Sequence, residues 1–157
     1  MPHKPHVTIS TAVVLTGLSK RTLWRRIADG LLRKIATDRP EEESRLVVED
    51  LLQLGKLELS ENEQQTLLRA DQGDADAQLA LALLFLRRER PEAAASWFAK
   101  AAQQGQADAM HWLGTLLAEG NGIEQDDSLA AEWIGKAAAQ DHPIAKAQMA
   151  TLLPRAF

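Results

Sequence analysis

The residues of this chain best suited to chemistry are cations in the stretch TGLSKRTLWRRIADGLLRKI, residues 16–35, which holds six of the 18 lysines and arginines. Arginine can bond guanine through two hydrogen bonds or contact phosphate, and a threonine hydroxyl can contact phosphate or a base edge. The expected DNA-contacting residues here are Lys20, Arg21, Thr22, Arg25 and Arg26. Two alternatives stay open, namely an ordinary solvated helix face and a helix that binds protein.

Other reactive groups lack the partners that catalysis or metal binding needs. Cysteine is absent, which excludes disulfides, thiolate metal sites and a cysteine nucleophile. No GxxxxGK[ST] phosphate loop is present. His3 and His6 lie among prolines in an expected flexible tail. His111 and His142 lack the spacing of an acid–histidine–nucleophile set. We therefore expect no enzymatic activity, no metal site and no cofactor.

The cations must be positioned by helices, and the local sequence predicts two of them. Ser10 is the expected N-cap of a first helix, TAVVLTG, which Gly17 ends. Ser19 is the expected N-cap of a second helix, KRTLWRRIAD, which Gly30 ends. A helix, a short turn and a second helix form the helix-turn-helix pattern.

The second helix has two different sides at 100° per residue. Leu23 and Ile27 fall on one side, which must pack against the first helix, and the arginines fan across the other. Trp24 lies at the edge of the apolar side, where we expect it to pack in the core, with a sugar or phosphate contact as the alternative. The cationic side is left exposed, as a recognition helix requires.

The residues that follow predict a winged helix. LLRKIAT and SRLVV are expected to form two short strands around the loop DRPEEE, and EDLLQLGKL another helix. The stretch TGLSKRTLWRRIADGLL resembles the winged helix of MerR-type and AlpA/excisionase-type proteins, which implies binding of double-stranded DNA. Arg45 occupies the position of an arginine that often starts the second wing strand in that family, and we expect it to contact phosphate. Glu41, Glu42 and Glu43 at the wing tip would repel phosphate.

The second half of the chain repeats itself every 32 to 36 residues. DADAQLALALLFL, QADAMHWLGTLLA and HPIAKAQMATLLP align, as do PEAAASWFAKAAQQG and DSLAAEWIGKAAAQD. Two helices per repeat at this period predict an α-solenoid, with Trp97 and Trp133 packed in its core. The stretch GNGIEQDDSLAAEWIGKAAAQDHPIAKAQMATLL resembles a Sel1-like repeat, a relative of the tetratricopeptide repeat. The resemblance covers about residues 65–153 and implies a protein-binding scaffold without catalysis.

By analogy with tetratricopeptide repeats, helices 76–87, 108–118 and 144–153 should line the binding face. We expect His111, Trp112 and Thr115 to point outward and bind a partner, with the tryptophan as the hot spot. The alternative is that Trp112 packs on a neighbouring repeat or on the N-terminal module. The last repeat lacks a polar capping helix, so we expect its end to be open to a partner protein or to a second copy of the chain, which would give a homodimer.

Charge and composition divide the chain near residues 55–60. Residues 1–57 carry ten lysines and arginines against seven acids, and residues 58–157 carry eight against fifteen. We therefore expect a mainly α protein with a winged helix-turn-helix domain at 1–57 and a Sel1-like solenoid at 58–157. The absence of an apolar run of 18 or more residues predicts no membrane span. The lack of an apolar core in MPHKPHVTIS predicts no secretory signal, and with the absence of cysteine it indicates a cytoplasmic protein. The leading hypothesis is a DNA-binding transcriptional regulator, and the alternative is a protein–protein adaptor whose two modules both bind protein.

Overall fold

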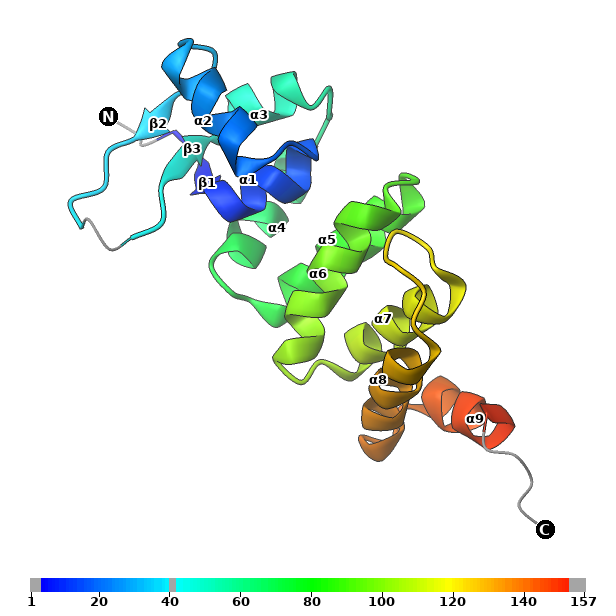
Figure 1. Ribbon diagram of the computed structural model, residues 1–157. Coiled ribbons are helices and arrows are strands. Elements are labelled where there is room, and N and C mark those ends of the chain that lie inside the picture. The colour runs from blue at the N-terminus through cyan, green and yellow to red at the C-terminus, as the bar shows by residue number, and fades with distance from the viewer. Residues whose placement is uncertain (1–3, 40–41, 153–157) are drawn as a thin grey trace. The chain divides into compact units, whose positions relative to one another are not determined.

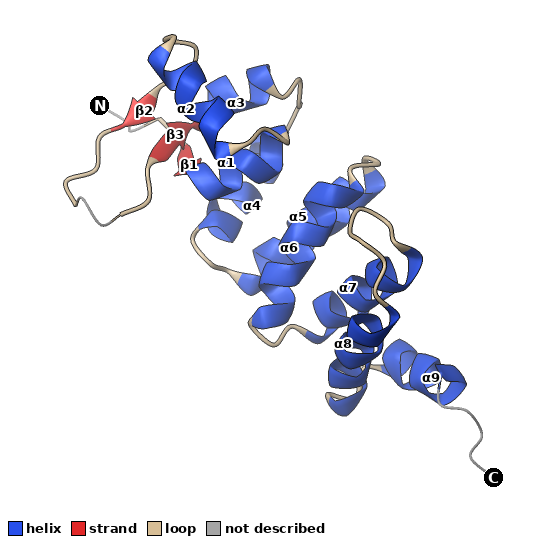
Figure 2. Cartoon of the chain, in the orientation of Figure 1, coloured by secondary structure: helices blue, strands red, loops and turns tan. Residues whose placement is uncertain are grey.

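The computed structural model describes residues 4–39 and 42–152. In these residues the fold is mainly helical, with one small sheet near the N-terminus (Figures 1 and 2). The chain forms two compact units, residues 1–72 and residues 73–157.

The first unit surrounds a three-stranded antiparallel sheet with short helices. Strand β3 is central, with β1 on one side and β2 on the other. Its elements in chain order are β1 (His6–Thr8), α1 (Ile9–Thr16), α2 (Lys20–Ala28), β2 (Lys34–Ile35), β3 (Arg45–Val47), α3 (Val48–Leu54) and α4 (Glu61–Asp71).

The two helices expected at the cationic stretch are present, with one change at the first cap. Helix α1 begins at Ile9 because the Thr8 side chain, and not that of Ser10, accepts a hydrogen bond from the Thr11 amide. Gly17 ends α1 in the left-handed region at φ 70°, which glycine adopts without strain. Ser19 caps α2 as expected, accepting from the Thr22 amide at 3.1 Å.

Strand β1 replaces part of the flexible tail expected at the N-terminus. His6 pairs with Val47 of β3, and Val7 is fully buried. His3 lies outside the described residues. The two expected strands are present as β2 and β3 but are shorter than their sequence segments, at two and three residues.

Helix α4 belongs to the first unit, so the unit boundary falls after Gln72 and not after Leu57 as expected. The Asp71 side chain, only 1% exposed, explains this position. It accepts hydrogen bonds from the Thr8 amide at 3.1 Å and from the hydroxyls of Thr8 and Thr11 at 2.6 Å each. Arg45 approaches the same carboxylate at 3.5 Å.

The later boundary changes the charge of the first unit. Residues 1–72 hold 11 lysines and arginines and 11 acids, so the formal net charge of this unit is zero. Residues 73–157 hold 7 lysines and arginines and 11 acids, so the formal net charge of the second unit is −4. The positive excess expected for residues 1–57 is therefore cancelled by the acids of residues 58–72.

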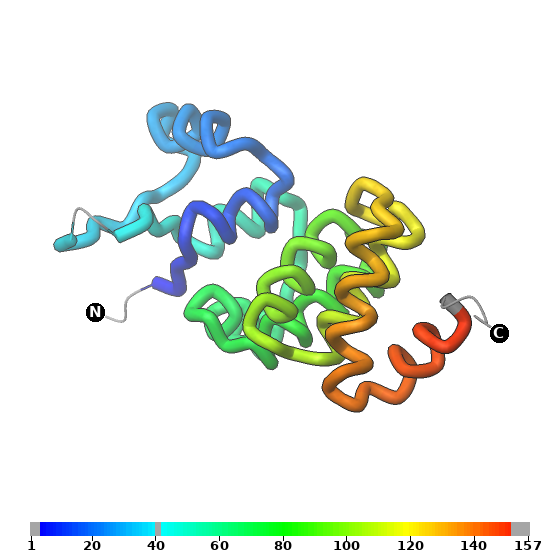
Figure 3. Tube along the Cα trace, turned by 60° about the horizontal axis from the view of Figure 1, so that its bottom comes forward, coloured from blue at the N-terminus to red at the C-terminus, as the bar shows by residue number. Residues whose placement is uncertain are grey.

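The second unit is a series of helical hairpins (Figure 3). Its helices are α5 (Ala75–Arg87), α6 (Pro91–Gln103), α7 (Ala107–Glu119), α8 (Asp127–Ala139) and α9 (Pro143–Leu152). Each helix packs on the next along the chain, most closely within the pairs α5–α6 and α7–α8. The expected helices 76–87, 108–118 and 144–153 correspond to α5, α7 and α9.

Small residues allow the close packing of these pairs. A Cβ atom on Gly114 would lie 2.5 Å from Cγ1 of Ile134, so only glycine fits where α7 crosses α8.

Trp97 is fully buried as expected, whereas Trp133 is only half-buried. Gly122, at φ 74°, lies in the loop before α8, where a Cβ would come within 2.2 Å of the Pro91 backbone.

Candidate interaction surfaces on the two units

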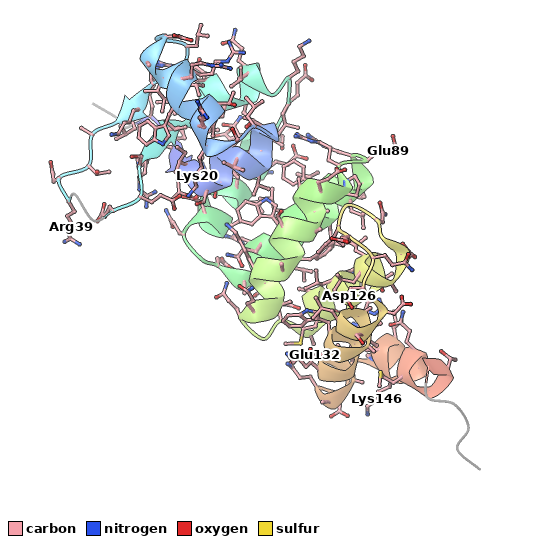
Figure 4. The ribbon with its side chains drawn as sticks, viewed as in Figure 1. Lys20, Arg39, Glu89, Asp126, Glu132 and Lys146 are labelled. Atoms are coloured by element: carbon pink, nitrogen blue, oxygen red, sulfur yellow. The ribbon has the colours of Figure 1, made fainter. Side chains whose placement is uncertain are left out.

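Two of the expected DNA-contacting residues already have partners at the start of α2. The Lys20 ammonium, labelled in Figure 4, lies 3.6 Å from the Glu43 carboxylate. Glu43 also accepts hydrogen bonds from the Ser10 amide, at 2.9 Å, and from the Ser10 hydroxyl. Thr22 contributes its hydroxyl to the helix cap, 3.0 Å from the Ser19 hydroxyl.

The α2 arginines differ in their exposure. Arg21 and Arg25 are exposed one helical turn apart and form no ion pair with any residue that the structure describes. Arg26 is half-buried, and its Nε has no hydrogen-bond partner among the described residues. Arg21 and Arg25 are therefore the two predicted contacts that α2 presents freely to solvent.

Arg45, the sixth predicted contact, is turned toward its own unit. Its guanidinium lies 3.5 Å from the buried carboxylate of Asp71 and is about two-thirds buried. A phosphate contact would have to compete with this internal carboxylate.

Arg33, which no sequence motif marks, forms ion pairs with two acids of α3. Its Nε lies 2.9 Å from Asp50, and its Nη2 lies 3.0 Å from Glu49. Hydrogen bonds from Arg33 hold the pKa of Asp50 and of Glu49 below the ordinary carboxylate value. No local spacing signals this cluster, because Arg33 is 16 residues or more from both acids.

Trp24 was expected in the core but is 43% exposed. Leu23 and Ile27 face inward on α2 as expected, and Trp24 lies outside the apolar side that they form. The Lys34 ammonium of β2 lies 5.2 Å from the centre of the indole ring, within range of a cation–π interaction. Leu31, in the turn after α2, is 56% exposed.

On the repeats, the three expected partner-binding residues lie in different environments. Trp112 is partly exposed and stacks on buried Phe98, with ring centres 5.9 Å apart and planes 11° from parallel. His111 was expected to point outward but is 7% exposed, with Nδ1 2.9 Å from Oε1 of Gln148. Thr115 is half-buried and donates to the His111 carbonyl.

His111 belongs to a histidine pair that joins α7 to α9. Its ring stacks on that of His142 at 4.8 Å. The Ala145 amide donates to Nδ1 of His142, whose Nε2 lies 2.8 Å from Oδ1 of Asp108. His142 therefore caps α9 through Nδ1 and contacts α7 through Nε2. Burial lowers the pKa of His111 below its ordinary value of 6.5.

Two classes of site find no support in the part of the chain that the structure describes. Among the described residues, no group of three or more histidines and acids is placed to hold a metal ion. No helix among those residues has the length and apolar character to cross a membrane.

Comparison with known proteins identifies the second unit. The Sel1 repeat family model matches residues 75–106 and residues 107–142, which correspond to the pairs α5–α6 and α7–α8. The crystal structure of a Sel1 repeat protein from Oxalobacter formigenes is similar at 35% identity and a TM-score of 0.50. The similarity covers 52% of this chain and 35% of that one, so it spans about a third of that protein's length. No curated protein matches this chain. Residues 75–142 are two Sel1 repeats.

Proposed function

We propose that this protein is a non-enzymatic protein–protein interaction adaptor whose Sel1 repeats bind a protein partner. The observation that carries the proposal is the match of both helix pairs, residues 75–142, to the Sel1 repeat. Such repeats bury their cores against neighbouring repeats and leave extended helix faces for other proteins. This supports the adaptor hypothesis over the DNA-binding regulator.

The partner surface centres on Trp112 of α7. The ring is partly exposed, and stacking on Phe98 holds it in place, so it loses little freedom when a partner covers it. Fixed aromatic side chains of this kind carry a large share of binding energy at protein interfaces. Thr115 lies one turn farther along α7, whereas His111 is covered and contributes through α9 packing.

The test begins with crosslinking of the intact protein to its partner and identification of the partner by mass spectrometry. Dissociation constants are then measured for the wild type, Trp112→Ala and the control Trp133→Ala, a half-buried tryptophan on α8. We expect Trp112→Ala to weaken binding at least ~10-fold, as for a hot spot, and Trp133→Ala to have a much smaller effect. Equal affinities for wild type and Trp112→Ala would refute this surface. Light scattering of the protein alone tests the expected homodimer.

A second candidate function is contact with duplex DNA by the first unit, arranged as a winged helix-turn-helix of the MerR/AlpA kind. The α1–turn–α2 geometry and the two exposed arginines Arg21 and Arg25 favour it. The zero net charge of the unit and the internal pairing of Lys20 and Arg45 weigh against it.

The salt dependence of binding tests the DNA hypothesis. Two phosphate contacts from Arg21 and Arg25 predict that log K falls with log[salt] with a slope of about 1.8, at about 0.9 per contact. The double variant Arg21→Ala with Arg25→Ala should abolish that slope. Absence of duplex binding at low salt rules the second candidate out.

A further inference from the structure

Five cations of the first unit pair with carboxylates at 4 Å or less: Lys4 with Glu49, Lys20 with Glu43, Arg33 with Asp50, Arg39 with Glu42 and Arg45 with Asp71. Five others form no such pair with any residue that the structure describes: Arg21, Arg25, Arg26, Lys34 and Lys56. Of these, Lys34 reaches the Trp24 ring, and Arg21 and Arg25 are exposed close to Trp24 on α2.

The geometry of α2 places these residues on one surface. Arg21 precedes Trp24 by three residues, so the two side chains are neighbours on adjacent turns of the helix. Arg25 is exposed at the next position, about 100° farther round α2. Lys34 reaches the ring from β2, with its ammonium 5.2 Å from the ring centre. The Trp24 surface, defined as Arg21, Trp24, Arg25 and Lys34, is thus an exposed aromatic ring bordered by unpaired positive charges.

We infer that the Trp24 surface binds an acidic protein segment that also carries an apolar side chain. The carboxylates would pair with Arg21, Arg25 and Lys34, and the apolar side chain would cover the exposed part of the indole. This binding is separate from that of the Sel1 repeats, so the adaptor would hold two partners at once, one on each unit.

The chain itself contains an example of the contact that such a ligand would make. Glu43, in the loop before β3, accepts hydrogen bonds from Ser10 at the start of α1 and pairs with Lys20 at the start of α2. The Glu43 carboxylate therefore already lies against the start of α2. The Trp24 surface extends this arrangement with cations whose carboxylate partners are not supplied by the described chain.

Two features favour a short acidic protein segment over a nucleic acid. The unit has no net charge, so it lacks the long-range attraction that draws proteins to a long polyanion such as duplex DNA. Trp24, at 43% exposure, gains stability from an apolar partner, which duplex phosphates do not provide.

The test uses the intact protein and synthetic, fluorescently labelled peptides. The first peptide alternates aspartate or glutamate with leucine, the second replaces each leucine with serine, and the third replaces each acid with lysine. A short DNA duplex carrying the same label is measured in parallel. Fluorescence anisotropy gives each dissociation constant at low and at physiological salt.

We expect binding of the acidic leucine peptide only, weakened at least ~10-fold by Trp24→Ala and by the Arg21→Ala, Arg25→Ala double variant. Lys56→Ala, which removes an exposed cation outside this surface, and Trp112→Ala on the repeats should each leave the affinity within about twofold of wild type. The result for Trp112→Ala keeps this inference distinguishable from the proposed repeat function.

Three results would overturn the inference. They are failure of the acidic leucine peptide to bind at low salt, equal binding of the serine peptide, and tighter binding of the duplex with the same arginine dependence. Circular dichroism confirms that each variant is folded. If Trp24→Ala is unfolded, Arg25→Glu takes its place, because this exposed position tolerates the change and the reversed charge should abolish peptide binding.

Discussion

Replacing Asp71 should detach α4 from the first unit. The carboxylate is 1% exposed and accepts hydrogen bonds from one amide and two hydroxyls, belonging to Thr8 and Thr11, while Arg45 pairs with it. In Asp71→Ala the partly buried Thr8 amide loses its acceptor, which costs about 1–3 kcal/mol. Loss of the charged partner of Arg45 and of the hydroxyl bonds brings the total to about 3–5 kcal/mol, as for other broken buried pairs.

The conservative variant separates charge from geometry. Asp71→Asn keeps one oxygen acceptor for the two hydroxyls, which lie within 2.6 Å, and loses the negative charge facing Arg45. We expect it to destabilise the unit by about 1–2 kcal/mol, between wild type and Asp71→Ala. Asp29→Ala removes an exposed acid that ends α2 and serves as the control, with a change within about 0.5 kcal/mol.

Hydrogen exchange with mass spectrometry locates the effect, and urea denaturation measures its size. In Asp71→Ala, amides of α1 and α4 should exchange faster, while those of α5 to α8 keep the wild-type rate. The reasoning fails if the variant unfolds at the wild-type urea midpoint. It also fails if the second unit loses protection as much as the first, because α4 would then be part of the repeats.

Three further predictions concern caps, packing and pH. Ser19→Ala removes the acceptor for the Thr22 amide and should lower the stability of the first unit by about 1 kcal/mol in urea denaturation. Gly114→Ala forces a Cβ against Ile134 and should cost about 1–3 kcal/mol, visible as a lower melting temperature of the second unit. Burial holds the folded-state pKa of His111 below its unfolded value of 6.5, so its stabilising contribution is complete above pH 6.5. It should decline as the pH falls below that value, and His111→Gln should flatten the decline in urea midpoints measured from pH 7.5 to 5; an unchanged decline would contradict this account.

The features of the fold that depend on neighbouring residues or on a repeated pattern could be predicted from the sequence. The Ser19 cap and the Gly17 end of α1 follow from residues at most a few positions apart, so their signals are present in a single sequence. The helix pairs follow from a pattern that the chain repeats every 32 to 36 residues, which a single sequence also carries. The prediction that Trp24 packs in the core was wrong. On a helical wheel Trp24 lies at the edge of the apolar side of α2, and there the neighbouring elements decide whether a side chain is buried.

Features set by distant residues could not be predicted in this way. Strand β1 exists because β3 pairs with it from 40 residues away. Asp71 joins α4 to α1 across 60 residues or more, which placed the unit boundary later than composition indicated. On a helical wheel of α7, His111 falls on the side that points outward. In the structure it is covered by Gln148 of α9 and by His142, which caps α9.

The loop between α7 and α8 has a consequence for how the repeats unfold. At Gly122 it passes so close to the Pro91 backbone, where α6 begins, that the second repeat touches the first outside their stacked helices. In a linear array, stability is shared between each repeat and its interfaces, and every added contact strengthens the coupling between neighbours. Unfolding of the α5–α6 pair therefore removes the support of this loop, and the two repeats lose their structure cooperatively.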